Sequence, residues 1–545
     1  MKIVVPEKVS PRGIAELKAQ PGWTVVELPP SSAKDGSLAR ELADADGLIV
    51  RSAVKVTAEL LEHAPKLKVV GRAGVGVDNV DLEAATRKGV VVMNTPGGNA
   101  ISVAELVIGL MVAMARQVLR ADTTTRAGQW EKKALMGSEL MGKTLGIIGL
   151  GKVGSELAKR ARAFGMDLVA YDPFVSPLAA REAGAKLLPL EDVLASSDYL
   201  SLHVTLTPET RGMFNDRAFA RMKNGARLVN CARGELINEN ALYTALKSGK
   251  LAGAALDVFQ KEPPTGSELL ALPNLIATPH IAASTQEAQE RVGFRIAEAV
   301  RDYLTTGAVH NAVNVPSVSY EEQRALQPWL DLGSRMGAML GQLVPGKPRD
   351  LLLHFAGDLE GLNLDLIANA AVAGLLNQIL AEDVNLVNAR SLAEKGGLAL
   401  HVTQEAYTRG EARTLTARVT TDGQELRIQG AVVNGVSPRL LGIDENMAIE
   451  APLQGNLVVL RNDDVPGVIG HVGAVLGRRG INIASFTLGR QEGARQGAAA
   501  GDAASKNGRP LAAVALVQTD APVPPHVIED IRQHPAIHYA RAIQL

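Results

Sequence analysis

Three closely spaced glycines join a short apolar stretch to a helical one in the middle of the chain. The run Thr144–Ile148 is followed by Gly149, Gly151 and Gly154, after which Ser155–Phe164 has the composition of a helix. In such a strand–turn–helix, the first glycine permits a tight turn and the second lets backbone N–H groups approach a phosphate. The third allows the helix to lie close to the strand, with its N-terminus facing negative charge. This spacing predicts a Rossmann-type parallel sheet that binds a dinucleotide.

A carboxylate stands at the position where a ribose-binding acid is expected. Asp172 directly follows the next predicted strand, Asp167–Tyr171. Its carboxylate would accept hydrogen bonds from both ribose hydroxyls and repel a 2′-phosphate, which favours NAD over NADP. In the alternative interpretation the glycines form only a structural turn and Asp172 caps a helix. The order of strand, glycines and helix favours the cofactor site.

Three further apolar runs each have a polar residue close behind them. The pairs are Ala226–Cys231 with Arg233, Ala252–Phe259 with Glu262, and Leu275–Thr278 with His280. Each run is short and bounded by Gly or Pro, as expected of buried strands in a parallel sheet. Ligands of open α/β sheets bind outside the carboxyl ends of the strands. We therefore expect the three side chains to converge on one pocket.

These residue types suit the oxidation of a 2-hydroxy acid. His280 can accept the hydroxyl proton, and Glu262 can hold its ring and favour the imidazolium that forms. Arg233 can grip a carboxylate in a bidentate fork, and Asp257 is placed to bind the nicotinamide side of the cofactor. Each residue alone could be a loop, turn or cap residue, but their joint spacing favours catalysis. Cys231 has no adjacent base, which predicts a packed small residue and no nucleophile.

Composition narrows the class of protein. The 545 residues suggest roughly three or four domains, and 46% hydrophobic with 21% charged residues suits globular cores. The net charge of −1 gives no electrostatic case for a nucleic-acid or membrane partner. The apolar segment Leu106–Ala115 is too short to span a bilayer, and MKIVVPEKVS lacks a signal-peptide core. The single Cys231 fits a reducing cytoplasm, and we expect a cytoplasmic enzyme without a metal.

The order of predicted elements divides the chain into four units. A parallel α/β unit for the substrate, residues 1–98 and 287–315, encloses a Rossmann unit at 99–286. One long helix, from about Ser102 to Arg126 with a capping-box spacing to Glu105, leads out of the first unit, and the amphipathic stretch Gln286–Tyr303 leads back. An α+β unit follows at 316–452, and residues 453–545 show the βαββαβ order of a ferredoxin-like fold. The Gly-, Ala- and Ser-rich loop Gln491–Pro510 is expected to be mobile.

Six motifs resemble those of the D-isomer-specific 2-hydroxyacid dehydrogenases. They are GRAGVGVDNVD (71–81), NTPGGN (94–99), GLGKVG (149–154), NCARGE (230–235), ALDVFQKEPP (255–264) and TPHIAAST (278–285). The resemblance implies a flavodoxin-like substrate domain and the catalytic set Arg233, Glu262 and His280. It places Arg51, Arg72 and Asn99 near the carboxylate and phosphate of a substrate. The NAD contacts that it implies are Val75, Gly149, Gly151, Lys152, Val153, Gly154, Asp172, Val204, Cys231, Ala232 and Asp257.

The C-terminal segment RNDDVPGVIGHVGAVLGRRGINIASF (461–486) resembles an ACT regulatory domain, which binds amino acids at paired interfaces. The block before it resembles the intervening domain of the long family members that oxidise 3-phosphoglycerate to 3-phosphohydroxypyruvate in serine biosynthesis. This implies a homo-oligomer, a dimer or tetramer, with L-serine as effector held by Asn462, Asp464 and Asn482. Some relatives carry His where this chain has Asn462. Glu235 and Ala100 also depart from the family pattern, and Ala100 could alter substrate contacts.

Three other functions stay open at this point. The substrate could be another D-2-hydroxy acid such as lactate, although Arg51 and Arg72 favour a phosphorylated one. A non-catalytic NAD sensor that presents a face to a protein partner would bind NAD without turnover. The C-terminal unit could serve assembly alone, with the strand Ile481–Leu488 pairing edge to edge with a second copy.

Overall fold

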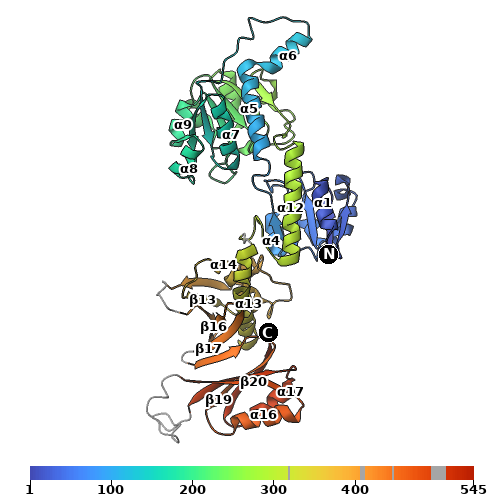
Figure 1. Ribbon diagram of the computed structural model, residues 1–545, viewed down its shortest axis with the longest axis vertical. Helices are drawn as coiled ribbons and strands as arrows, with labels where there is room; N and C mark the ends of the chain where they lie inside the picture. The colour runs from blue at the N-terminus through green and yellow to red at the C-terminus, as the bar shows by residue number, and fades with distance from the viewer. Residues whose placement is uncertain (317–319, 406–411, 445–446, 492–510) are drawn as a thin grey trace.

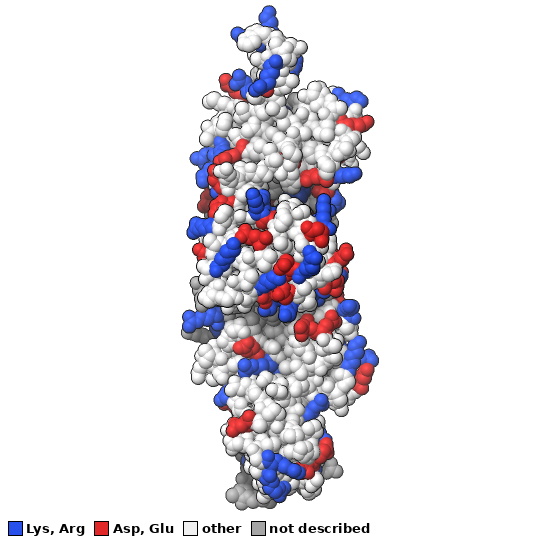
Figure 2. Space-filling view, turned by 90° about the vertical axis from the view of Figure 1, so that its right-hand side faces the viewer, with Lys and Arg blue, Asp and Glu red and all other residues white. Residues whose placement is uncertain are grey.

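The computed structural model describes residues 1–316, 320–405, 412–444, 447–491 and 511–545. The loop predicted to be mobile, Gln491–Pro510, lies almost wholly outside the described residues. Three sheets follow one another along an elongated molecule, with the substrate sheet between the Rossmann sheet and the C-terminal sheet (Figure 1). On the face shown in Figure 2, basic and acidic side chains alternate over the surface, in keeping with the net charge of −1.

The first sheet has the strand order of a flavodoxin-like fold. Its five parallel strands are ordered β2-β1-β3-β4-β5. The strands are β1 (Lys2–Val5), β2 (Thr24–Glu27), β3 (Gly47–Val50), β4 (Val69–Arg72) and β5 (Val91–Met93). All residues of β3 and β5 are buried, because helices cover both faces of a parallel sheet. The helices that matter below are α1 (Pro11–Lys18), α4 (Leu82–Arg87) and α12 (Gln286–Thr306). The predicted α/β unit is confirmed.

The helix that leaves this sheet is broken, so the prediction of one helix from Ser102 to Arg126 is wrong. Helix α5 (Ala100–Arg116) and helix α6 (Val118–Arg126) meet at Gln117, whose φ of 48° is left-handed, and the two axes differ by 61°. The capping-box prediction also fails, because Ser102 bonds to Thr285 Oγ1 at 2.7 Å. Within the described residues no single helix is long and apolar enough to cross a membrane; this bent pair passes that test only when taken together.

The second sheet is the predicted Rossmann sheet. Seven parallel strands are ordered β12-β11-β10-β9-β6-β7-β8, and the order reverses between β6 and β9, which is where ligands of such sheets bind. The strands are β6 (Thr144–Ile148), β7 (Asp167–Tyr171), β8 (Lys186–Leu187), β9 (Tyr199–Leu202), β10 (Ala226–Asn230), β11 (Leu251–Leu256) and β12 (Leu275–Ala277). Helix α12 then returns to pack on α1 and β4 of the first sheet. The nesting of the Rossmann unit inside the first unit is therefore confirmed.

The third sheet contains ten strands that come from two predicted units. Residues of the intervening unit form β13 (Asp350–Ala356), β14 (Ala399–Gln404), β15 (Thr414–Thr420), β16 (Glu425–Val433), β17 (Ser437–Ile443) and β18 (Met447–Pro452). Its helices are α13 (Tyr320–Leu343), α14 (Leu364–Leu376) and α15 (Ala389–Gly396). The predicted βαββαβ order follows as β19 (Asn456–Asp463), α16 (Val468–Arg478), β20 (Ile483–Gln491), β21 (Ala512–Thr519), α17 (Pro525–Arg532) and β22 (Ile537–Gln544).

The two C-terminal units are joined through this sheet. Strand β18 pairs with β20, with Met447 opposite Gln491 and Ala448 opposite Arg490. One hydrophobic cluster contains Leu340 of α13 together with Leu457 and Val459 of β19. The predicted boundary at residue 452 thus falls between strands that share a sheet and a core. This pairing with β18 involves Arg490 and Gln491 of β20, beyond the stretch Ile481–Leu488, so edge pairing of that stretch with a second copy stays a prediction.

Candidate active site

The glycine loop has the geometry that its spacing predicts. Gly149 has φ of 94°, and a Cβ on Gly154 would lie 2.1 Å from the Gly149 carbonyl oxygen, so helix α7 (Lys152–Ala163) and the loop touch there. A Cβ on Gly151 would meet no atom within 4 Å. Gly149 and Gly154 are therefore required by the fold, for the tight turn and the close helix packing. Gly151 is not required by packing within the chain, and it leaves open space in front of the α7 N-terminus. This cradle fits a pyrophosphate.

Asp172 supports the loop from the end of β7. Its two carboxylate oxygens accept hydrogen bonds from the backbone N–H groups of Leu150 (2.8 Å) and Phe174 (2.9 Å). The carboxylate thereby faces the glycine turn, as a ribose-binding acid must. Two of the other predicted cofactor residues also lie at the loop: Val204 Cγ1 is 3.0 Å from the Cβ position of Gly149, and the Lys152 side chain reaches Gly97 of the substrate unit.

His280 and Glu262 form a hydrogen-bonded pair at the carboxyl ends of neighbouring strands. His280 Nδ1 lies 2.8 Å from Glu262 Oε2, and both side chains are partly exposed to solvent. The other Glu262 oxygen, Oε1, accepts from the Phe259 N–H at 3.2 Å, which fixes the carboxylate. His280 adopts a left-handed φ of 53°. With Nδ1 engaged by the carboxylate, Nε2 is the nitrogen available to a substrate, and a pocket of about 370 Å³ opens beside the pair.

Asp257 holds the turn that carries His280. Its side chain is fully buried, and its carboxylate accepts from Thr278 Oγ1 (2.6 Å) and from the backbone N–H groups of Ile281 and Ala282 (both 2.8 Å). The His280 N–H donates to the Asp257 carbonyl at 2.9 Å. The sequence predicted a cofactor contact for this residue, and the geometry gives it a positioning role. A contact of Asp257 with the nicotinamide stays a prediction.

Arg233 reaches from the Rossmann unit to the substrate unit. Its guanidinium donates to the Ala232 carbonyl at 2.7 Å and forms an ion pair with Asp78 at 3.0 Å. The loop around Gly76 wraps this group so closely that a Cβ on Gly76 would lie 2.0 Å from Arg233 Nη2. The predicted substrate-binding arginine thus lies where the two units meet.

Arg72 of the substrate unit is close enough to Arg233 for their charges to interact. Burial lowers the pKa of the Arg72 guanidinium, and the positive charge of Arg233 lowers it further. Arg72 Nε and Asn99 Oδ1 are buried without a hydrogen-bond partner among the described residues. Arg51 is near enough to add to the same positive potential, although its Nη1 donates to the Lys8 carbonyl at 3.1 Å. Neighbouring cations with unused donors are suited to binding an anion.

Cys231 and His203 are both neutral groups of the Rossmann unit. Burial, with a contribution from Asp257, raises the pKa of the Cys231 thiol far above its ordinary value, so it is no nucleophile, in line with its predicted packing role. His203 was missed by the sequence reasoning. It directly follows β9, its Nε2 lies 2.8 Å from Ser201 Oγ, and burial lowers its pKa to about 4. The signal was available, because His203 also follows an apolar strand. No cluster of metal-ligating side chains occurs in the described part of the chain.

The predicted effector residues lie at two ends of the C-terminal unit. Asn462 is buried with its Oδ1 unpaired, and Asp464 forms an ion pair with Arg490 at 2.7 Å. Asn482 bonds to Asp520, level with the opposite end of β19. Six residues of strand, about 20 Å, separate the two groups. One chain therefore does not bring Asn482 to Asn462, and only a second copy could do so.

Fold and site together define an NAD-binding dehydrogenase of 2-hydroxy acids, and comparisons with known proteins agree. The NAD binding domain of D-isomer specific 2-hydroxyacid dehydrogenases matches residues 108–282, and the D-3-phosphoglycerate dehydrogenase intervening domain matches residues 325–444. D-3-phosphoglycerate dehydrogenase of Methanocaldococcus jannaschii is 41% identical over 512 residues, which is 93% of this chain and 94% of that protein. The chain belongs to the D-3-phosphoglycerate dehydrogenase family, and the predicted family and cofactor are confirmed.

Solved structures match a little over half of the chain. The TT0316 protein from Thermus thermophilus is 37% identical and covers 57% of this chain and all of its own, with a TM-score of 0.53. An NAD-dependent formate dehydrogenase from Staphylococcus aureus, solved with NAD, is 30% identical over 58% of this chain and all of its own, with a TM-score of 0.51. The fold predicted for the catalytic part is thereby confirmed.

Proposed function

We propose that this chain oxidises 3-phospho-D-glycerate to 3-phosphohydroxypyruvate with NAD, the first step of L-serine biosynthesis. The observation that carries the proposal is the His280–Glu262 pair, 2.8 Å apart at the carboxyl end of the sheet that holds the glycine loop. The relatives that match over nine-tenths of the chain are D-3-phosphoglycerate dehydrogenases, which favours this substrate over lactate.

The residues divide the work of the reaction. His280 Nε2 accepts the proton of the substrate's C2 hydroxyl, and the Glu262 carboxylate stabilises the imidazolium through Nδ1. A bound NAD would supply the acceptor for the hydride of C2. Arg233 holds the substrate carboxylate and polarises the C2 oxygen. Arg72, Arg51 and Asn99 hold the carboxylate and the phosphate, and the unpaired donor Arg72 Nε supports the assignment for Arg72.

The cofactor contacts are proposed from the same cradle. Gly151 leaves room for the pyrophosphate, Asp172 binds the adenosine ribose, and Lys152 with Val153 begins the helix that faces the phosphates. The exposed side chain of Val75, on the loop that approaches Arg233, suits a contact across the cleft. Val204, Cys231 and Ala232 complete the set at the ends of β9 and β10.

L-serine is the proposed effector, bound where two C-terminal units meet. The unpaired Oδ1 of buried Asn462 supports a polar ligand at this end of β19, with Asp464 beside it and Asn482 supplied by the second copy. This requires a homo-oligomer, a dimer or a tetramer. The enzyme acts in the cytoplasm, where the single Cys231 stays reduced.

NADH formation with 3-phosphoglycerate, with and without L-serine, tests these proposals together. Turnover that L-serine suppresses supports both the active site and the effector site. Turnover indifferent to L-serine removes the effector role and leaves the C-terminal unit to assembly. Faster turnover of D-lactate would replace the substrate. Binding of NAD with no turnover in either direction would favour the sensor.

A further inference from the structure

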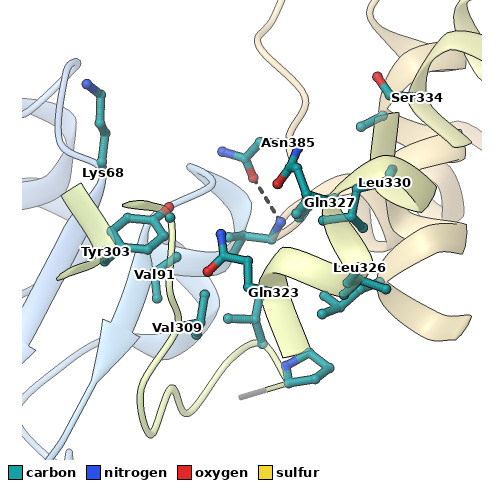
Figure 3. A pocket seen from close by; sticks show the side chains of 18 of the residues that line it. Lys68, Val91, Tyr303, Val309, Gln323, Leu326, Gln327, Leu330, Ser334 and Asn385 are labelled. Carbon is teal, nitrogen blue, oxygen red and sulfur yellow. Dashed lines mark hydrogen bonds between the residues drawn. The ribbon is translucent and has the colours of Figure 1, made fainter. Parts of the chain in front are cut away.

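A second cavity lies far from the glycine loop, between the substrate unit and the intervening unit (Figure 3). Its volume is about 510 Å³, which is within the range of small-molecule sites. Val91 of β5 and Tyr303 of α12 line one side, and Leu326 and Leu330 of α13 line the other. Ala370 of α14 adds to the second wall. Neither the catalytic pair nor Arg233 takes part, so this cavity is separate from the active site.

The lining is mainly apolar, with a polar rim that includes the ionisable side chains of Lys68 and Asp331. The ionisable side chains Lys68 and Asp331 are already engaged, Lys68 with Asp46 at 3.0 Å and Asp331 with the side-chain amide of Gln327 at 2.8 Å. Burial raises the pKa of Tyr303, so its hydroxyl stays protonated and neutral. An anionic ligand would therefore lose its hydration without gaining an unpaired cation, which is costly.

One polar atom in this cavity lacks a partner. Gln323 Oε1 is buried and makes no hydrogen bond, although the Nε2 of the same amide donates to the Thr306 carbonyl at 2.9 Å. An unsatisfied buried acceptor costs about 1–3 kcal/mol, so a ligand that donates to it gains that free energy on binding. In Figure 3, Gln323 lies between the walls that carry Tyr303 and Leu326.

We propose that this cavity binds an uncharged amphipathic small molecule. Its aliphatic body lies against Leu326, Leu330 and Ala370, and its hydrogen-bond-donating head meets Gln323 Oε1. The chemistry of the lining selects the class: aliphatic side chains suit the body, the unpaired acceptor suits a donor head, and no free cation is present for an anionic head.

Such a ligand touches both units and so acts on their contact. At the rim of the cavity, Asn385 of the intervening unit donates to the Gly89 carbonyl at 2.9 Å, in the turn between α4 and β5. The chain runs from β5 into the loop that ends at Asn99, one of the residues proposed to bind the substrate. A molecule that binds one arrangement of the two units better than another therefore shifts the position of a substrate-binding loop.

The test compares three probes with the same aliphatic tail on the full-length protein: hexanamide, hexanoate and hexylammonium. Ligand-observed NMR titration should show saturable hexanamide binding at one site per chain, with weaker binding of both ions. Ala370→Leu fills the cavity and should abolish hexanamide binding. Ala325→Leu, at an exposed position of the same α13 wall outside the lining, is the matched control and should leave it unchanged.

A second variant protects the test against a folding defect. Gln323→Leu keeps most of the volume but removes the acceptor, and it should weaken hexanamide binding by about fivefold to about a hundredfold. No saturable binding of hexanamide to the wild type, or equal binding to Ala370→Leu, would overturn the proposal. Tighter binding of hexanoate would overturn the uncharged class. Binding is read directly, so either result leaves the proposed dehydrogenase activity to its own assay.

Discussion

Replacing the buried Asp257 with asparagine should weaken both the fold and the turnover number. The carboxylate accepts from Thr278 Oγ1, Ile281 N–H and Ala282 N–H, with one backbone donor on each oxygen. An asparagine side chain offers only one oxygen, so whichever way the amide is oriented, at least one buried N–H faces an NH₂ group. Leaving one such donor unsatisfied costs about 1–3 kcal/mol. Asp257→Ala leaves both backbone donors unsatisfied and should cost about 2–6 kcal/mol.

The kinetic consequence follows from the position of His280 in the same turn. A misplacement of a catalytic group by about 1 Å can cost about 10²-fold in rate, so kcat of Asp257→Asn should fall by about that factor. The KM for NAD should stay near the wild-type value, because the glycine loop is untouched. Urea unfolding gives the stability change and initial rates of NADH formation give the kinetic change. The exposed Asp167→Asn, at the start of β7, is the matched control and should change stability by no more than about 0.5 kcal/mol.

A different pattern would refute this reasoning. If Asp257 acts chiefly by contacting the nicotinamide, then Asp257→Asn will raise the KM for NAD while the free energy of unfolding stays at the wild-type value. That result would restore the role that the sequence predicted and would remove the positioning role.

Three further predictions concern the glycine loop, His203 and Asp78. Gly151→Ala should fold with wild-type stability, and calorimetry should show that it loses NAD affinity. Gly154→Ala should lower the melting temperature, because its Cβ would lie 2.1 Å from a carbonyl oxygen. Equal melting temperatures of the two variants would contradict this. The pKa of His203 is about 4 when folded and 6.5 ordinarily, so the unfolded state binds more protons between these values. The contribution of neutral His203 to the free energy of unfolding is complete above pH 6.5 and falls by about 2 kcal/mol at about pH 5. Urea unfolding of His203→Gln should show no such loss between these pH values. Asp78→Asn should raise the KM for 3-phosphoglycerate several-fold, because Arg233 is then no longer held by its ion pair with Asp78. The free energy of unfolding should change little, because this ion pair is exposed. A lower KM would instead mean that Asp78 competes with the substrate for Arg233.

The catalytic part was predictable because its signals are local. Glycine spacing and the position of a polar residue after an apolar run depend only on neighbours in the chain, and they correctly placed His280 beside Glu262. Helix continuity was not predictable in the same way, because helical periodicity persists across Gln117 while the backbone there turns to a left-handed φ. The ten-stranded sheet was also invisible, since the β18–β20 pairing joins segments whose contact the sequence pattern does not specify.

Side-chain roles were predicted less well than side-chain positions. Asp257 follows a strand like the catalytic residues, but only the three-dimensional fold shows its carboxylate occupied by the turn around His280. Asn462 and Asn482 are close in the effector motif, yet strand direction places them at opposite ends of β19. The sequence could not show this, because the separation depends on strand pairing.

The central claim is that His280 is the base of a 3-phosphoglycerate dehydrogenase. The most direct test measures NADH formation from 3-phosphoglycerate by the wild type and by His280→Gln, with NAD affinity measured in parallel. We predict that kcat falls by about 10²–10⁴-fold in the variant while its NAD affinity is retained. A variant that keeps the wild-type rate, or a wild-type protein that binds NAD but turns over no 3-phosphoglycerate, would contradict the claim.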